Sequence, residues 1–176
     1  VPDYELSTEK ARQALPRELP YKDAVYNVSR VGLLPAAMNP VVLAQAAQQG
    51  KSGVAAAPAQ DADTCACAGG TRESAFADEL AAAQAQSNAL LFTATQDKLH
   101  QPYRGALMPP STELIALFRS KGYAAAVSGA GPCVLVLHYG NAREAIDQIA
   151  SEQLASGHWR VLHLPINTAG VEIERR

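Results

Sequence analysis

The stretch AVSGAGPCVLVL, residues 126–137, consists of two apolar runs that are separated by small and turn-forming residues. Gly129 and Gly131 lack a Cβ atom, so they tolerate positive φ angles and allow another group to approach the backbone closely. A β-hairpin turn explains this composition, because glycine is a common turn residue. A ligand-binding loop also explains it, since successive backbone amides in such a turn can form an anion-binding concavity. The pattern alone favours the hairpin.

The elements around this stretch predict the fold class. We expect strands on both sides of the turn and over residues 1–6, 158–166 and 170–175. We expect helices over residues 7–15, 21–34, 39–49, 76–99, 111–122 and 141–157, where Ser111 and the pair Asn141 and Glu144 give N-cap signals. This order predicts an α+β fold of the ferredoxin-like type, a split β-α-β-β-α-β antiparallel sheet with its helices on one face.

The overall composition is that of a folded globular chain. Of its 176 residues, 48% are hydrophobic and 18% are charged, and the formal net charge is −2. These values favour a single domain over residues 1–176 and argue against global disorder. Because the charges are mixed and form no basic stripe, they also argue against nucleic acid as a partner.

Residues 51–74 have neither a helical nor a strand period and are dominated by small residues. We expect a low-complexity surface insertion there. Three cysteines without regular spacing, at positions 65, 67 and 133, favour a reducing compartment and offer no metal site. The chain opens with no signal peptide and has no uninterrupted apolar run of about 18 residues. We therefore expect a cytoplasmic protein without a membrane partner.

Thr8 and Arg12 are the first candidate binding residues. They are four positions apart in the helix predicted over residues 7–15, so their side chains project from one face. A hydroxyl and a guanidinium placed side by side can receive a carboxylate or a phosphate. A capped helix start followed by a solvated arginine explains the same residues, and the pattern alone favours that explanation.

The loop LHQPYRGAL, residues 99–107, is the second candidate site. It combines polar and aromatic side chains with an arginine: His100, Gln101, Tyr103 and Arg104. Both binding loops and ordinary surface loops have this composition, and the two remain open. Polar residues also recur at helical spacing in the helix that begins at residue 21, namely Lys22 with Tyr26 and Asp23 with Asn27. We expect two or three of these to form only a solvated helix face.

Five segments together resemble a known family. They are VPDYELSTEKARQALP (1–16), YKDAVYNVSR (21–30), DKLHQPYR (97–104), VSGAGP (127–132) and LPINTAGVE (164–172). Their order resembles the C-terminal half of the homoserine kinases of the GHMP kinase superfamily, in an actinobacterial form. VSGAGP is similar to the third motif of the superfamily, whereas STEKAR and LHQPYR are more specific to homoserine kinases. The resemblance spans nearly the whole chain except residues 51–74.

The resemblance implies a GHMP kinase C-terminal domain that serves the ATP- and Mg²⁺-dependent phosphorylation of the side-chain hydroxyl of L-homoserine, a step in threonine biosynthesis. Thr8 matches the family threonine near the reacting groups and is the implied catalytic residue. Arg12 and Arg104 match substrate-binding arginines, and Arg12 matches the one that receives the carboxylate. The residues that match the loop beside the nucleotide phosphates, here called the glycine loop, are Ser128, Gly129, Ala130 and Gly131.

The chain also departs from the family pattern. It lacks the nucleotide-binding loop P-x-x-x-G-L-G-S-S and the Mg²⁺-binding acid, both of which would lie before Val1. We therefore expect a fragment that does not phosphorylate homoserine by itself. Two alternatives remain open, another GHMP kinase acting on a different small alcohol and a non-catalytic ferredoxin-like module that binds an amino acid. Assembly as a homodimer is left open.

Overall fold

The stretch 126–137 forms most of an antiparallel hairpin. In a computed structural model, which describes residues 1–41, 72–165 and 173, strand β1 (Ala124–Val127) pairs with strand β2 (Val134–Leu137). Ala124 lies opposite Leu137, and Val127 lies opposite Val134. The predicted hairpin is therefore confirmed, and residues 128–133 connect its strands.

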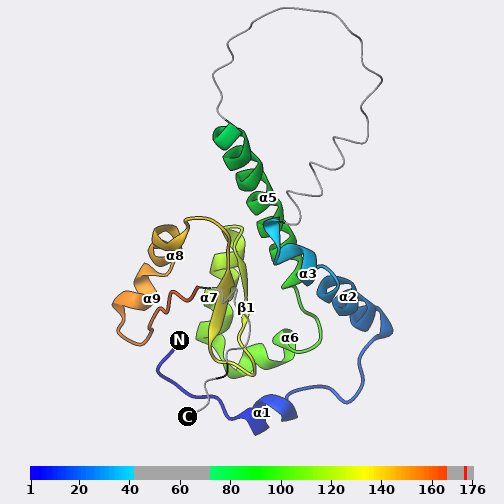
Figure 1. The fold of residues 1–176 in the computed structure, drawn as a ribbon. Coiled ribbons are helices and arrows are strands. Elements are labelled where there is room, and N and C mark those ends of the chain that lie inside the picture. Colours follow the sequence, from blue (N-terminus) through cyan, green and yellow to red (C-terminus); the bar gives the residue numbers. More distant parts are fainter. Residues whose placement is uncertain (42–71, 166–172, 174–176) are drawn as a thin grey trace, which may run out of the picture.

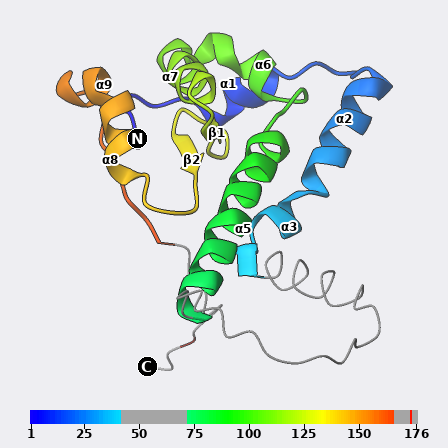
Figure 2. The ribbon, with the colours of Figure 1, turned by 90° about the horizontal axis from the view of Figure 1, so that it is seen from above.

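Helices surround this hairpin (Figure 1). They are α1 (Thr8–Gln13), α2 (Tyr21–Val31), α3 (Leu34–Ala37), α5 (Arg72–Ala94), α6 (Gln101–Arg104), the 3₁₀ helix η1 (Gly105–Leu107), α7 (Pro109–Ser120), α8 (Arg143–Ile149) and α9 (Ser151–Ala155). Seen from above, the long helix α5 lies between the hairpin and the pair α2 and α3, while α8 and α9 lie on the opposite side of the hairpin (Figure 2). The fold class is α+β, as predicted.

The hydrophobic core consists of two clusters that meet at β1. Ala125 packs with Leu114 and Phe118 of α7. Its neighbour Ala124 packs instead with Leu91 of α5 and with Ala37 of α3. Successive residues of a strand point to opposite faces, so the two clusters lie on opposite faces of the hairpin. The expectation of helices on a single face is therefore wrong for the described residues.

The predicted outer strands make only a short contact. Pro2 and Trp159 form an isolated antiparallel bridge, flanked by hydrogen bonds from Asp3 N to His158 O (2.9 Å) and from Arg160 N to Val1 O (2.8 Å). Pro2 has no backbone N–H and cannot extend a ladder. Within residues 1–41 and 72–165, the sheet therefore has two strands rather than four. The predicted edge strand at 170–175 lies outside the described residues except for Ile173.

Several element boundaries differ from the prediction. Residues 72–74 belong to α5, so the proposed insertion ends earlier than residue 74, and its remainder lies outside the described residues. Ser111 is a buried residue inside α7 and not its cap. The helix predicted over 141–157 is interrupted at Ala150, and α8 begins without a side-chain cap, so the predicted capping box is wrong. No helix in the described part of the chain is long and apolar enough to cross a membrane.

Candidate functional site

Helix α1 presents Thr8 and Arg12 at the surface. The Ser7 side chain caps the helix by accepting a hydrogen bond from Lys10 N (3.4 Å), and Thr8 is the first helical residue. Ala11 is fully buried and anchors the inner side of the helix. Arg12, the next residue, is exposed, and its guanidinium makes no hydrogen bond or ion pair with any described residue. Arg12 is therefore one of two exposed cations of this helix, with Lys10, that have no ion-pair partner in the described residues.

Arg104 lies at the end of α6 and contacts α1 directly. Its Nε donates a hydrogen bond to the backbone oxygen of Ala11 at 3.1 Å. This bond places the Arg104 side chain beside the residue that precedes Arg12. The two terminal nitrogens of Arg104 have no partner within the described residues, so they remain available to a ligand. The bond therefore joins α6, which carries Arg104, to α1, which carries Thr8 and Arg12.

The Asp97 side chain binds the backbone amides at the start of α6. Its carboxylate accepts hydrogen bonds from the backbone N–H groups of Leu99 (3.1 Å), His100 (3.0 Å) and Gln101 (2.6 Å). The side-chain amide of Asn27 in α2 donates a fourth bond at 2.5 Å. Only 7% of the Asp97 side chain is exposed. A buried carboxylate with this many donors fixes the turn that leads into α6.

The pKa of Asp97 reflects two opposing effects. Burial raises the pKa, because it disfavours the charged form. The hydrogen bonds from Gln101, His100, Asn27 and Leu99 lower it more strongly, since each of them stabilises the carboxylate. The pKa therefore lies below its ordinary value, and the charged form of Asp97 stabilises the fold.

Gln101 connects α6 to the hairpin. Its side-chain oxygen accepts a hydrogen bond from the backbone N–H of Val127 at 3.0 Å. Val127 is the last residue of β1 and directly precedes Ser128, the first residue of the glycine loop. The segment LHQPYR is therefore tied to α1 at one end and to the glycine loop at the other.

The glycine loop is the turn of the hairpin. Ser128 N donates to Cys133 O (2.8 Å) and Gly131 N donates to Ser128 O (3.1 Å). Gly129 and Gly131 have φ angles of 63° and 89°, a region that glycine tolerates best. Ser128 and Gly129 are exposed, whereas Ala130 and Gly131 are half-buried and the Met108 side chain packs against Gly131. The loop is thus a hairpin turn with accessible backbone.

A third connection joins the loop to the segment before α1. The buried hydroxyl of Ser111 donates to the backbone oxygen of Pro132 at 2.5 Å. Because this bond uses the only hydroxyl proton of Ser111, Tyr4 is the donor in the 2.7 Å hydrogen bond between the Tyr4 and Ser111 hydroxyls. Together with the bonds of Gln101 and Arg104, this relay closes a ring that links α1, α6 and the glycine loop.

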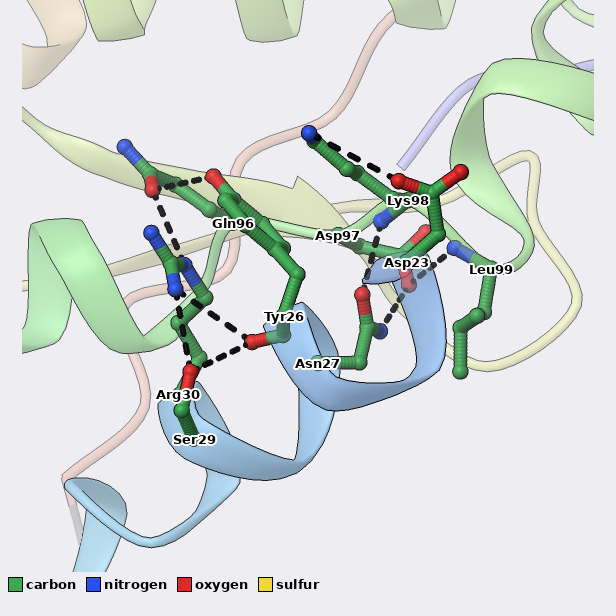
Figure 3. A network of polar contacts seen from close by, with 9 residues as sticks. All are labelled: Asp23, Tyr26, Asn27, Ser29, Arg30, Gln96, Asp97, Lys98 and Leu99. Carbon is green, nitrogen blue, oxygen red and sulfur yellow. Dashed lines mark hydrogen bonds and ion pairs between the residues drawn. The ribbon is translucent and has the colours of Figure 1, made fainter. Parts of the chain in front are cut away.

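The polar face of α2 packs against the chain that precedes α6 (Figure 3). The Tyr26 hydroxyl donates to Gln96 at 2.6 Å, and Asn27 accepts from Lys98 N at 2.9 Å. The Arg30 guanidinium carbon and Lys98 Nζ lie 3.2 Å and 4.3 Å from the centre of the Tyr26 ring. The expectation of a solvated face is therefore wrong for Asp23, Tyr26 and Asn27, whereas Lys22 is exposed. The apolar face of α2 is exposed instead, with Val28 72% exposed.

Two hollows lie beside α6. One, of about 550 Å³, is lined by Lys22, Asp23, Tyr26, Lys98, Pro102 and Tyr103. The second, of about 410 Å³, shares some of these residues and continues between α5, α7 and β1. Thr8, Arg12, Arg104 and the glycine loop line neither hollow.

Comparison with known proteins places this arrangement in a family. Residues 74–155 match the family model described as the C-terminal region of the GHMP kinases. Homoserine kinases from Leifsonia xyli, Clavibacter michiganensis and Corynebacterium aurimucosum are 33%, 32% and 33% identical to the chain. Each of these alignments covers 99% of the chain and 40% of the relative. The chain is therefore similar to the C-terminal part of these kinases, and residues 74–155 match the GHMP kinase family.

The chain spans about 40% of the length of the curated relatives it matches. Within residues 1–41, 72–165 and 173, no three His, Cys, Asp or Glu side chains gather closely enough to hold a metal ion.

Two residues that connect the elements of the candidate site were not identified as such from the sequence. The sequence pattern assigned no structural or binding role to Asp97. It indicated Gln101 only as one of several polar residues in the loop 99–107. A signal for Asp97 does exist, because aspartate often caps the backbone amides of the residues that follow it. Gln101 has no comparable local signal, since its partner Val127 is 26 residues away.

Proposed function

We propose that this chain is the C-terminal part of an ATP-dependent homoserine kinase that phosphorylates the side-chain hydroxyl of L-homoserine in threonine biosynthesis. The observation that carries the proposal is the hydrogen-bonded ring. It joins the Thr8 and Arg12 helix, the Arg104 helix and the glycine loop, which are the three segments with the strongest family resemblance. The names of the relatives, each a homoserine kinase, support the choice of substrate.

Arg12 and Arg104 would bind the carboxylate of homoserine. Both carry guanidinium nitrogens without a partner in the described residues, and the Arg104 side chain lies beside Ala11. A guanidinium donates two parallel hydrogen bonds to a carboxylate and thereby fixes its orientation. Each charge-assisted hydrogen bond contributes about 1.5–3 kcal/mol. This binding would hold the small zwitterion with its hydroxyl directed toward the phosphate donor.

Thr8 and the glycine loop would border the reacting groups. Phosphoryl transfer depends mainly on the positioning of the nucleophile and on charge stabilisation, so a rigid surface contributes directly to the rate. The exposed backbone of Ser128 and Gly129 would leave room for the ATP phosphates. Thr8, at the first turn of α1, would lie near the transferred group.

We also propose that residues 1–176 form one C-terminal domain with a ferredoxin-like sheet. The antiparallel contact between residues 1–3 and 158–160 would form one half of that sheet, and the pair β1 and β2 would form the other. Such a sheet would bring the segment before α1 next to β2.

A coupled assay of ADP release tests the proposed activity. The full-length protein should turn over with homoserine and ATP and should prefer homoserine to mevalonate and to sugars. The 176 residues alone should show no turnover, because the alignments reach only about 40% of each relative. A preference for another alcohol would contradict the substrate assignment. Turnover by the isolated chain would contradict its dependence on the rest of the protein.

A further inference from the structure

We propose that Gln101 is a positioning residue that fixes the substrate-binding Arg104 relative to the glycine loop. The inference rests on the proposed function and adds to it a residue that does not itself contact the substrate. Its basis is the 3.0 Å hydrogen bond between the Gln101 side-chain oxygen and the backbone N–H of Val127.

Helix α6 needs such a contact to have a defined orientation. It contains four residues, too few for a helix to be stable by itself. Asp97 holds the backbone amides at its start, including that of Gln101 itself. These bonds join α6 to the chain that immediately precedes it, and they do not join it to the hairpin. In the described residues, the Gln101 side chain makes the hydrogen bond that reaches β1 from α6.

The partner of Gln101 lies on the open edge of β1. Ser128 N bonds to Cys133 O, so the backbone of Ser128 faces β2. Consecutive residues of an antiparallel strand direct their polar groups to opposite edges, and Val127 N–H therefore points away from β2. The backbone oxygen of Ala125, two residues earlier, points to the same edge and accepts a bond from Arg119 Nη1 at 3.0 Å. Side chains from α6 and α7 thus satisfy an edge that no further described strand covers.

The position of Gln101 couples two parts of the proposed site. Gln101 is the first residue of α6 and Arg104 is the last, three positions later. Arg104 Nε donates a hydrogen bond to Ala11 O. Val127 precedes the glycine loop by one residue. Loss of the bond from Val127 to Gln101 would free one end of α6 and let Arg104 shift relative to the loop. Such a shift would impair the binding of the amino acid more than the binding of ATP.

The test uses the full-length protein with two substitutions at this position and one control elsewhere. Gln101→Met keeps the length of the side chain but removes the acceptor, whereas Gln101→Glu keeps an acceptor oxygen. Tyr139→Phe removes a 2.6 Å hydrogen bond from a side chain to the backbone oxygen of Met38, away from α6. This control therefore shows how the loss of one hydrogen bond away from α6 affects the stability of the protein without altering the proposed site.

For Gln101→Met we expect the KM for homoserine to rise about fivefold, the equivalent of one net hydrogen bond, while the KM for ATP changes less than about twofold. Gln101→Glu and Tyr139→Phe should retain a KM for homoserine close to that of the unmodified protein. Hydrogen exchange of the Val127 amide should accelerate in Gln101→Met and stay slow in Tyr139→Phe.

An unchanged KM for homoserine in Gln101→Met, with a melting temperature lowered as in Tyr139→Phe, would overturn the positioning role. An unchanged exchange rate at Val127 would also overturn it. If the unmodified protein fails to phosphorylate homoserine, the proposed function is wrong. The exchange rate would then still decide whether Gln101 fixes α6 to the hairpin.

Discussion

Arg104 Nε lies 3.1 Å from the backbone oxygen of Ala11 and donates a hydrogen bond to it across 93 positions of the chain. Ala11 is fully buried, whereas Arg12, the next residue, is exposed. The bond therefore joins the two elements that carry the candidate arginines. Neither guanidinium has an acidic partner in the described residues, and two neighbouring cations without a counter-charge favour the binding of an anion.

The first prediction concerns Arg12. Arg12→Ala in the full-length protein should lower kcat/KM for homoserine about 10- to 100-fold, because a charge-assisted contact of about 1.5–3 kcal/mol is lost. The KM for ATP should change less than about twofold. Steady-state kinetics with each substrate varied in turn measure both effects. Equal losses for homoserine and ATP, or no loss at all, would argue against a carboxylate-binding role.

The second prediction separates the charge of Arg104 from its geometry. Lysine keeps the charge but has no Nε donor for Ala11 O and no planar pair of donors for a carboxylate. Arg104→Lys should therefore lose nearly as much kcat/KM for homoserine as Arg104→Ala. Lys10→Ala, which removes an exposed cation of α1, serves as the control and should leave the kinetics unchanged. Full activity of Arg104→Lys would show that charge alone is sufficient.

Local signals in the sequence predicted the parts of this structure that depend on local chemistry. The hairpin follows from two apolar runs around glycines, and the start of α1 follows from Ser7 as its cap. The face of α2 that packs against the rest of the protein could not be predicted in the same way. The apolar residues of α2 have the spacing of a buried face, yet Val25 and Val28 are exposed. The polar residues of α2 pack instead, because partners about 70 positions away satisfy them.

The candidate site was predictable in its residue types but not in its connections. Arg12 and Arg104 are recognisable from their motifs. The ring that joins them to the glycine loop consists of contacts between residues 21 to 107 positions apart. Ser111 illustrates the difficulty, since its position before an apolar stripe indicates a helix cap. In the structure it is a fully buried relay between Tyr4 and Pro132.

The third prediction compares the two glycines of the glycine loop. A Cβ atom at Gly131 would lie 2.5 Å from the sulfur of Met108, which is fully buried, whereas a Cβ atom at Gly129 would meet nothing within 4 Å. Both residues have positive φ angles, so alanine at either position costs about 1–2 kcal/mol of backbone strain. Gly131→Ala adds a packing conflict of about 1–3 kcal/mol.

Urea unfolding followed by circular dichroism should therefore rank Gly131→Ala as clearly less stable than Gly129→Ala. Combining Gly131→Ala with Met108→Ala should cost less than the sum of the two single substitutions, because the clash is removed. Equal destabilisation by the two alanine substitutions would show that Met108 moves aside without cost.

The fourth prediction is a pH dependence that originates at Asp97. Hydrogen bonds from three backbone amides and from Asn27 outweigh burial, so the pKa of Asp97 lies below its ordinary value. The charged carboxylate therefore stabilises the folded state fully above the unfolded-state pKa of about 3.9, and this contribution is lost as the pH falls through the lowered folded-state pKa. The substitution Asp97→Asn replaces the carboxylate with a neutral amide, whose single oxygen cannot accept all of these bonds.

Asp97→Asn should accordingly reduce the free energy of unfolding by about 1–3 kcal/mol at pH 7. The difference from the unmodified protein should stay constant down to about pH 5 and become smaller below about pH 4, since the unfolded-state carboxylate is then protonated while the native carboxylate stays charged until the pH falls through its lowered pKa. Glu113→Gln, at an exposed carboxylate of α7 without a partner in the described residues, should show no such difference. Urea unfolding at a series of pH values measures all three proteins. A difference that is the same at pH 3 and pH 7 would mean that the charge of Asp97 does not stabilise the turn before α6.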